Sequence, residues 1–262
     1  MKPKSDILGA MVSIARPRAW LLQLRAEIAQ AAENFAHAPI KACSEAEAEE
    51  RALAEIDGGV DGEGTATIRI HGVIEHADPF LSSWFGLVSP ARIQAALDRY
   101  RERADVARVW LHIDSPGGSV GGLNALCDYI RNYPKPVFAI VSGECCSAAY
   151  WLANAAKSIA AEPEAVVGSI GVYQLIVDDS EALKSQGLQF NYISTGPLKA
   201  AGATGMPLTE EQAQNIQRAV DDVFGLFKAA VNARRVVDDE VWAGGIYTAL
   251  TGKTLGLVDI LI

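Results

Sequence analysis

A serine lies at the predicted junction of a strand and a helix. The apolar run at 136–141 predicts a buried strand, and the small and aromatic residues at 148–153 favour a helix, so Ser147 falls between them. The first turn of a helix has backbone N–H groups without intrahelical partners, and these stabilise an oxygen that becomes an anion. Ser147 is therefore a candidate nucleophile. A serine at this position can also simply cap the helix, and this stretch leaves both interpretations open.

A glycine-rich turn is predicted to follow a neighbouring strand. Residues 114–122 read Asp-Ser-Pro-Gly-Gly-Ser-Val-Gly-Gly. Pro116 fixes one φ angle, whereas Gly117 and Gly118 permit conformations closed to other residues, so that backbone N–H groups can converge on one ligand atom. Such a turn can hold an oxyanion, or it can be a plain connection from strand to helix. It lacks the GxxxxGK[ST] pattern of a phosphate-binding loop.

A serine hydroxyl needs a neighbouring base before it becomes a good nucleophile. Of the four histidines only His112, in a predicted strand, is considered for this role, and a structural role fits it as well. A lysine can serve instead, because burial favours the neutral amine, which accepts a proton. Lys199 follows a predicted strand at 190–194 and has small or apolar neighbours, whereas Lys184 and Lys228 lie on predicted helices and are expected to be solvated. The alternative for Lys199 is an ordinary surface lysine.

The elements that must position these residues alternate between β-rich and helical patterns. Strands are predicted at 65–70, 106–113 and 136–141, and helices at 90–103, 123–132 and 208–233. This alternation predicts an α/β fold with a mostly parallel sheet covered by helices. In such sheets the chemistry lies at the carboxyl ends of the strands. We therefore expect the glycine turn and Ser147 to meet there, with the β-rich segment 166–176 available to pair with an extended peptide.

The first 64 residues are predicted to form a helical arm and a linker. Apolar spacing at 19–36 indicates an amphipathic helix, and Ser44 with Glu47 has the form of a capping box that opens an acidic helix ending near Ile56. The glycine-rich residues 57–64 predict a flexible linker. We expect the compact domain to span 65–262, with the arm packed on its surface or docked on a partner subunit.

Composition and charge restrict the possible functions. A chain of 262 residues, half of them hydrophobic, can bury the core of one sizeable α/β domain. Its net charge of -9 argues against a nucleic-acid partner, because phosphates select clustered Lys and Arg. The four cysteines, at 43, 127, 145 and 146, lack zinc-ligand and CxxC spacing, so no metal is predicted and a cytoplasmic setting is expected. No apolar run approaches the roughly 18 residues of a membrane span, so no membrane anchor is predicted.

Several motifs in order along residues 65–259 carry a family resemblance. This region resembles the signal peptide peptidase A (protease IV) family of Ser–Lys peptidases, which includes the head-maturation proteases of tailed phages. Residues 195–199, Thr-Gly-Pro-Leu-Lys, match the segment that carries the base lysine of that family. The other four motifs are Ile-Asp-Ser-Pro-Gly-Gly-Ser-Val at 113–120, Cys-Ser-Ala-Ala-Tyr-Trp-Leu-Ala at 146–153, Gly-Ser-Ile-Gly-Val at 168–172 and Gly-Leu-Val-Asp at 256–259.

The resemblance implies a ClpP/crotonase-like fold of repeated β-β-α or β-α units, an enzyme without a cofactor, and a division of roles in the site. The lysine would take the proton of the serine as it attacks a peptide carbonyl, an acyl-enzyme would form, and water would release it. The implied residues are Ser147 as nucleophile, Lys199 as base, Ser169 as the group that orients the amine, and an oxyanion hole formed by Gly117, Gly118 and the N–H of Ala148.

The chain departs from the family pattern at one point, and three alternative functions stay open. The family has Ala-Ser-Gly-Gly around the nucleophile, whereas this chain has Cys-Ser-Ala-Ala at 146–149, which is expected to narrow the room for a substrate backbone. The resemblance favours the phage branch, a peptide or protein substrate such as a capsid protein, and a homo-oligomer. The alternatives are a signal-peptide-degrading peptidase of the same family, a crotonase-type enzyme acting on acyl-CoA, and a non-catalytic capsid assembly protein.

Overall fold

The computed structural model describes residues 45–75 and 86–262, which form two compact units. Unit 1 contains the described residues up to Ser169 together with 246–262, and unit 2 contains 170–245. The predicted helix at 19–36 and the capping residue Ser44 lie outside the described residues. The stretch that was predicted to form one compact domain is therefore divided between two units, and each is described by itself.

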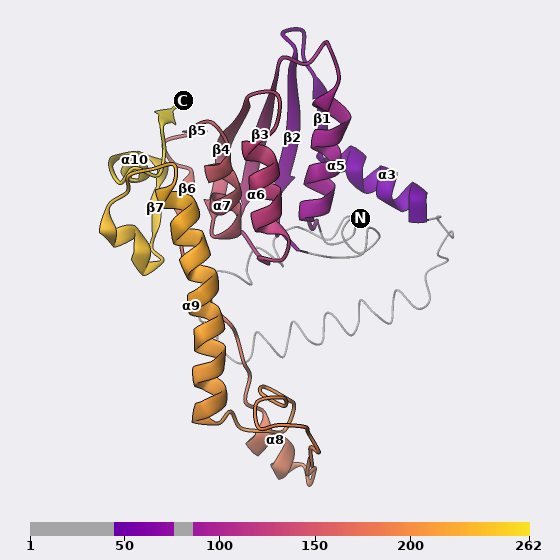
Figure 1. Cartoon of the computed structure of the whole chain (residues 1–262), viewed down its shortest axis with the longest axis vertical. Coiled ribbons are helices and arrows are strands. Elements are labelled where there is room, and N and C mark those ends of the chain that lie inside the picture. The colour runs from indigo at the N-terminus through magenta and orange to yellow at the C-terminus, as the bar shows by residue number, and fades with distance from the viewer. Residues whose placement is uncertain (1–44, 76–85) are drawn as a thin grey trace. The chain divides into compact units, whose positions relative to one another are not determined.

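Unit 1 is built on an eight-stranded sheet with the order β1-β2-β3-β4-β5-β8, in which β6 pairs with both β4 and β7 (Figure 1). Neighbouring strands are parallel except for β1 with β2 and β6 with β7. The predicted mostly parallel α/β sheet is thus confirmed. The strands are β1 Asp57–Val60, β2 Thr65–His71, β3 Arg108–Ser115, β4 Val137–Cys146, β5 Ile159–Ala161, β6 Val166–Gly168, β7 Ile246–Thr248 and β8 Ile260–Leu261.

Three helices stand side by side over the central strands (Figure 1). They are α5 Pro90–Arg101, α6 Leu123–Arg131 and α7 Ala148–Ala155, and α3 Glu45–Ile56 packs on α5 and β2. Alternate residues of β3 face these helices and are buried, the last of them Ser115. Burial of each large aliphatic side chain in this layer contributes about 1.5–3 kcal/mol. The core therefore lies between the helices and one face of the sheet, and α10 Ala249–Thr254 packs beside β6 and β7.

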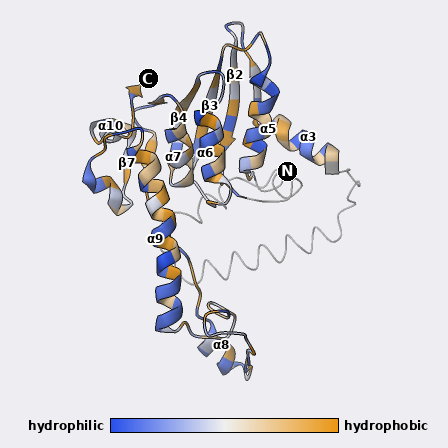
Figure 2. Ribbon diagram, in the orientation of Figure 1, coloured by the Kyte–Doolittle hydropathy of each residue, from blue (hydrophilic) through white to orange (hydrophobic). Residues whose placement is uncertain are grey.

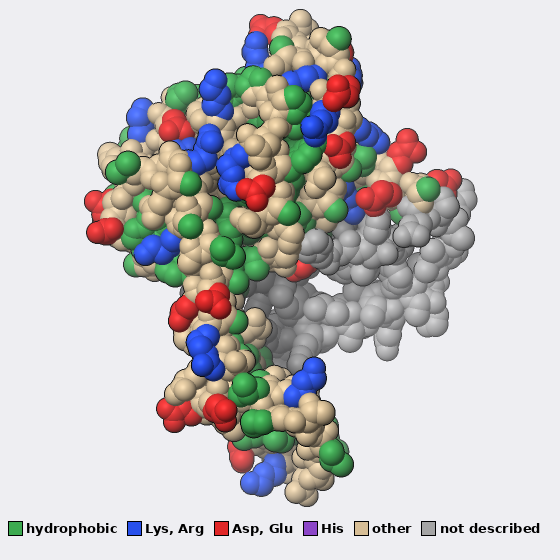
Figure 3. Space-filling model, in the orientation of Figure 1, with side chains coloured by type: hydrophobic (Ala, Val, Ile, Leu, Met, Phe, Trp, Pro, Cys, Tyr) green, Lys and Arg blue, Asp and Glu red, His purple; other side chains and the backbone are tan. Residues whose placement is uncertain are grey.

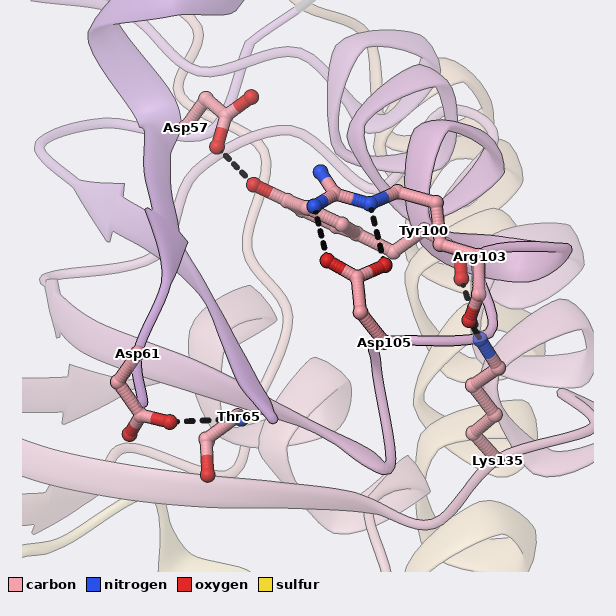
Figure 4. Close-up of polar contacts among 7 residues, drawn as sticks. All are labelled: Asp57, Asp61, Thr65, Tyr100, Arg103, Asp105 and Lys135. Carbon is pink, nitrogen blue, oxygen red and sulfur yellow. Dashed lines mark hydrogen bonds and ion pairs between the residues drawn. The ribbon is translucent and has the colours of Figure 1, made fainter. Parts of the chain in front are cut away.

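Residues 57–64 form a β-hairpin with β2, so the prediction of a flexible linker is wrong. The turn is closed by Asp61, whose Oδ1 accepts a hydrogen bond from the Thr65 N–H at 2.9 Å (Figure 4). The first strand is tied to α5 because the Tyr100 hydroxyl donates to the carboxylate of Asp57. Burial and the neighbouring Asp57 raise the pKa of Tyr100 to about 12, so the hydroxyl stays a donor. The tight turn uses Gly64 in a conformation with a φ of 75°, which glycine adopts readily because it has no Cβ.

The end of α5 is anchored by a lysine from the start of β4 (Figure 4). Lys135 Nζ donates to the carbonyl oxygens of Tyr100 at 2.7 Å and Arg103 at 2.5 Å. A cation at this point adds a hydrogen bond to carbonyl groups at the end of the helix and interacts favourably with the helix dipole. Arg103 also pairs with Asp105 at 2.6 Å.

On the face seen in Figure 3, acidic and basic side chains are interspersed.

Unit 2 contains α8 Ser180–Ser185, the long helix α9 Glu210–Asn232 and a short 3-10 helix, η1 Asp239–Ala243. The predicted helix at 208–233 is confirmed, and Thr209 with Gln212 forms its capping box. Hydrophobic and hydrophilic residues alternate around the turns of α9 (Figure 2). The predicted strand at 190–194 is absent, since these residues have no paired strand in the described part of the chain. None of the described helices is long and apolar enough to cross a membrane.

Candidate active site

Ser147 lies at the corner between β4 and α7 in a strained backbone conformation. Its φ is 53° and its ψ is -122°, a region that side-chain-bearing residues rarely adopt. Its carbonyl opens the helix by accepting from the Trp151 N–H at 3.0 Å, but its side chain makes no capping hydrogen bond. The interpretation of Ser147 as a side-chain cap therefore has no support in the structure, and its hydroxyl is left available for other contacts.

Ser169 lies at the end of the neighbouring strand and is strained in the same way. Its φ is 50°, and among the described non-glycine residues only Ser147 and Ser169 have a positive φ. Strand β6 pairs in parallel with β4, so that Cys146 lies opposite Gly168, and the Ser147 N–H donates to the Gly168 carbonyl at 2.9 Å. The structure thus brings the two predicted serines to adjacent strand ends. Strain of this kind costs about 1–3 kcal/mol per residue and is concentrated at functional sites.

The glycine turn packs directly against the nucleophile candidate. A Cβ at Gly117 would lie 2.8 Å from Ser147 Cβ and 2.9 Å from the backbone nitrogen of Ala148, closer than real side chains approach. The φ of Gly117 is 98°, which also requires glycine. The turn is held from its other side by Ile74, whose N–H donates to the Gly117 carbonyl at 2.8 Å. The prediction that the turn and Ser147 meet at one edge of the sheet is confirmed.

The hydrogen bonds of the turn distinguish between the predicted oxyanion donors. The Gly117 N–H already donates to the buried hydroxyl of Ser115 at 3.2 Å. Within the described residues no hydrogen bond is made by the N–H of Gly118 or of Ala148, the first residue of α7. The N–H groups of Gly118, in the turn, and Ala148, at the start of the helix, are thus left without a partner among the described residues.

The motif at residues 256–259 makes two hydrogen bonds to distant parts of the chain. The Tyr150 hydroxyl donates to the Leu257 carbonyl at 2.9 Å, and Asp259 Oδ2 accepts from the Ile159 N–H at 2.7 Å. Both contacts join residues about 100 positions apart in the sequence. The first contact ties α7 to the chain before β8, and the second ties that chain to the start of β5.

His112 and Cys146 have local roles that do not involve the hydroxyl of Ser147. The two ring nitrogens of His112 lie 3.1 Å from Ser142 Oγ and 3.3 Å from His71 Nε2, so both are engaged on the face of the sheet. Burial and the nearby carboxylate of Glu144 raise the pKa of Cys146 to about 12. The thiol is therefore protonated at neutral pH and is a poor nucleophile.

Lys199 belongs to unit 2 and is exposed. It lies in a turn that is closed by a hydrogen bond from the Lys199 N–H to the Gly196 carbonyl at 3.2 Å. Desolvation of its amine, which the sequence led us to expect, is not seen in the single chain. Lys184 pairs with Glu181 at 3.7 Å in the exposed manner predicted. Lys228 differs from the prediction, because its Nζ lies over the ring of Trp242 at 4.9 Å.

Sequence reasoning missed the contacts that Ile74 and Ser115 make with the glycine turn. Both interact through the backbone of the glycine turn, and no side-chain pattern marks such contacts in advance. No group of three or more His, Cys, Asp or Glu side chains within the described ranges is arranged to bind a metal ion.

Comparison with known proteins adds to this geometry. The sequence model of peptidase family S49 matches residues 130–262, just over half of the chain, including both strained serines and Lys199. The chain belongs to peptidase family S49. A Clp protease model matches residues 91–166, which contain the glycine turn and Ser147. Together with the mostly parallel sheet, this match identifies the Clp protease-like α/β fold predicted for the chain.

Relatives of this S49 chain include cellular and phage proteins. It is 31% identical to protease 4 of Salmonella typhi over 163 residues, 60% of this chain and 26% of that protein. It is 28% identical over 204 residues to the head-tail preconnector protein GP5 of Enterobacteria phage P21, covering 76% of this chain and 41% of the relative. Capsid assembly protease C of Escherichia phage lambda is also 28% identical, over 207 residues, with 76% and 46% covered. The chain thus spans less than half the length of each of these relatives.

A match among solved structures is the crystal structure of an enoyl-CoA hydratase/isomerase family member. It has a TM-score of 0.42 and 15% identity, and the match covers 78% of this chain and 67% of that one.

Proposed function

We propose that this S49 chain is a serine endopeptidase that cuts extended peptide segments with a Ser147–Lys199 dyad. The observation that carries the proposal is the arrangement in unit 1, where the strained and uncapped Ser147 lies against Gly117 and beside Ser169. A hydroxyl held at a helix start, next to two unpaired backbone N–H groups, suits acyl transfer.

The proposed mechanism assigns each group one task. Neutral Lys199 removes the proton of Ser147 as Oγ attacks the peptide carbonyl, and the developing oxyanion receives hydrogen bonds from the N–H groups of Gly118 and Ala148. One such donor contributes about 10²–10³-fold in rate in a studied protease. The lysine then returns the proton to the leaving amine, and water releases the acyl group. Ser169 supports the lysine amine.

An extended substrate is supported by the chain that follows Ser169. Residues 170–178 form no helix and pair with no strand in the described part of the protein. From position 173 to 177 every second residue is a large exposed apolar one, namely Tyr173, Leu175 and Val177. An unpaired segment of this kind can bind an extended peptide through backbone hydrogen bonds, with alternate side chains contacting it.

A protein substrate from a phage particle is supported by the names of two relatives, the head-tail preconnector protein and the capsid assembly protease. We infer that the substrate is a capsid or scaffold protein. Signal-peptide degradation is the second candidate and is supported by the similarity to protease 4. An acyl-CoA substrate and a purely structural role gain no comparable support.

Labelling with a fluorophosphonate probe followed by peptide mapping tests the proposal. We expect modification at Ser147, none in Ser147→Ala, and loss of peptide hydrolysis in both Lys199→Ala and Lys199→Arg, because a guanidinium stays protonated and cannot act as a base. Lys184→Arg is the matched control, since this exposed lysine lies in the same unit and should be dispensable. Labelling of another residue, or activity in Lys199→Arg, would refute the dyad.

A further inference from the structure

Strand β4 has a bulge immediately before the nucleophile candidate. Ile113 of β3 lies opposite Val141, and two residues later Ser115 lies opposite Cys145. Between these two pairs the three residues 142–144 of β4 face the single residue Asp114 of β3. Extra residues in one strand bend it and change the direction of the side chains that follow. The bulge therefore determines where β4 ends and where Ser147 lies.

The side chain of Asp114 fills this bulge. Its Oδ1 accepts a hydrogen bond from the Glu144 N–H at 2.9 Å. A Cβ built on Gly143 would lie 2.1 Å from the same oxygen and 2.5 Å from Cγ, so the carboxylate occupies space that only glycine leaves open. The backbone carbonyl of Asp114 accepts from the Gly72 N–H at 2.9 Å, which fixes the residue to the end of β2. The backbone of Asp114 is thus fixed to the end of β2, and its side chain holds the bulge of β4.

The other end of the bulge is tied to the same strand. Ser142 Oγ lies 3.1 Å from His112 Nε2, and the other ring nitrogen of His112 contacts His71 of β2. The first and last residues of the bulge are therefore both connected to β3 by side chains, which leaves the bulge little freedom to shift along its neighbour.

The strand resumes regular pairing directly after the bulge. Cys145 lies opposite Ser115, whose hydroxyl accepts from the Gly117 N–H, and Cys146 lies opposite Gly168. The next residue is Ser147. Any shift of the bulge would move the nucleophile relative to the glycine turn, and a misplacement of about 1 Å can cost about 10²-fold in rate.

We propose that Asp114 is a positioning residue, whose carboxylate holds the bulge at 142–144 and so sets the place of Ser147 against the turn at Gly117. This inference rests on the proposed role of Ser147 as the nucleophile. It assigns Asp114 no contact with the substrate, so the effect should appear in the rate at which Ser147 is acylated and not in the affinity for a peptide.

The experiment measures the second-order rate of fluorophosphonate labelling at Ser147, kcat and KM for a peptide, and the melting temperature. Asp114→Ala should slow labelling about 10²-fold with KM unchanged, whereas Asp114→Asn keeps an acceptor at Oδ1 and should label near the wild-type rate. Gly143→Ala places a Cβ against the carboxylate and should also slow labelling. In the double variant that clash is gone, so it should be no slower than Asp114→Ala, a non-additive result.

Asp105→Ala is the control, because this carboxylate pairs with Arg103 on an exposed connection and should leave the labelling rate unchanged. Wild-type labelling in a folded Asp114→Ala, equal losses in Asp114→Asn and Asp114→Ala, or additive losses in the double variant would overturn the proposal. If Asp114→Ala does not fold, Gly143→Ala decides, and a wild-type rate there overturns it. Failure of the wild-type protein to label at Ser147 would instead refute the nucleophile itself.

Discussion

Replacement of Ser147 by glycine should abolish activity and at the same time stabilise the protein. The φ of 53° at this position strains any residue with a Cβ but not glycine. Alanine keeps the strain, and no capping hydrogen bond is lost with the hydroxyl. The two inactive variants should therefore differ in stability only because of the backbone.

The size of the difference follows from two opposing terms. Release of the strained conformation contributes about 1–3 kcal/mol, and the greater freedom of glycine in the unfolded chain costs about 0.5–1 kcal/mol. Ser147→Gly should therefore exceed Ser147→Ala by about 0–2.5 kcal/mol in the free energy of unfolding, with a central value of about 1 kcal/mol. For a chain of this size each kcal/mol corresponds to about 2–4 °C in Tm. Ser147→Ala itself should stay within about 0.5 kcal/mol of wild type.

Denaturant and thermal unfolding of the three proteins provide the measurement, at one fixed protein concentration because any association would shift Tm. Ser169→Gly and Ser169→Ala repeat the comparison at the other strained serine, whose φ is 50°. Ser185, in helix α8, is the contrasting control, since glycine there should be less stable than alanine by about 1 kcal/mol. If Ser147→Gly is no more stable than Ser147→Ala, the strain attributed to this corner is not present.

Three further predictions concern the same region. Gly117→Ala should lose most activity, measured by peptide hydrolysis, because its Cβ would lie 2.8 Å from Ser147 Cβ. Cys146→Ser should retain turnover, and wild-type Cys146 should react slowly with iodoacetamide at pH 7, because burial raises the pKa of the thiol to about 12. Partial burial and the neighbouring His112 imidazole lower the pKa of His71. As the pH falls, His71 is therefore protonated in the unfolded chain before it is protonated in the folded chain. The free energy of unfolding should then decrease as the pH drops below about 6.5. Urea midpoints at pH 5 and pH 7 should differ less in His71→Gln, and an unchanged difference would contradict the assignment.

The sheet and its helices were predictable because their signals are periodic and local. The strands at 65–70 and 106–113 and the helix at 90–103 were placed within a few residues, and the general rule for parallel sheets brought the glycine turn to Ser147. The hairpin at 57–64 was missed because its glycines resemble those of a linker. The contacts that order it, from Asp61 and from the distant Tyr100, are visible only in three dimensions.

The sequence predicted that the glycine turn and Ser147 meet, but not the backbone geometry of the two serines. A positive φ at a serine is an exception to backbone preferences, so no propensity could assign it to Ser147 or Ser169. The bulge of β4 depends on a side chain 30 positions away, because Asp114 supplies the acceptor for Glu144. The strand predicted at 190–194 does not form. A β-rich composition gives a strand only where the edge of another strand is available for pairing.

The departure of this chain from the family pattern at the nucleophile can now be given a physical meaning. Ala148 and Ala149 replace the two expected glycines, and their side chains are 1% and 0% exposed within the first turn of α7. Their methyl groups therefore pack in the core and do not reduce the room for a substrate backbone, contrary to the expectation from sequence. Alanine is favoured over glycine in a helix by about 1 kcal/mol. This helix must hold a strained residue at its start, and the two alanines supply stability where Ser147 costs it.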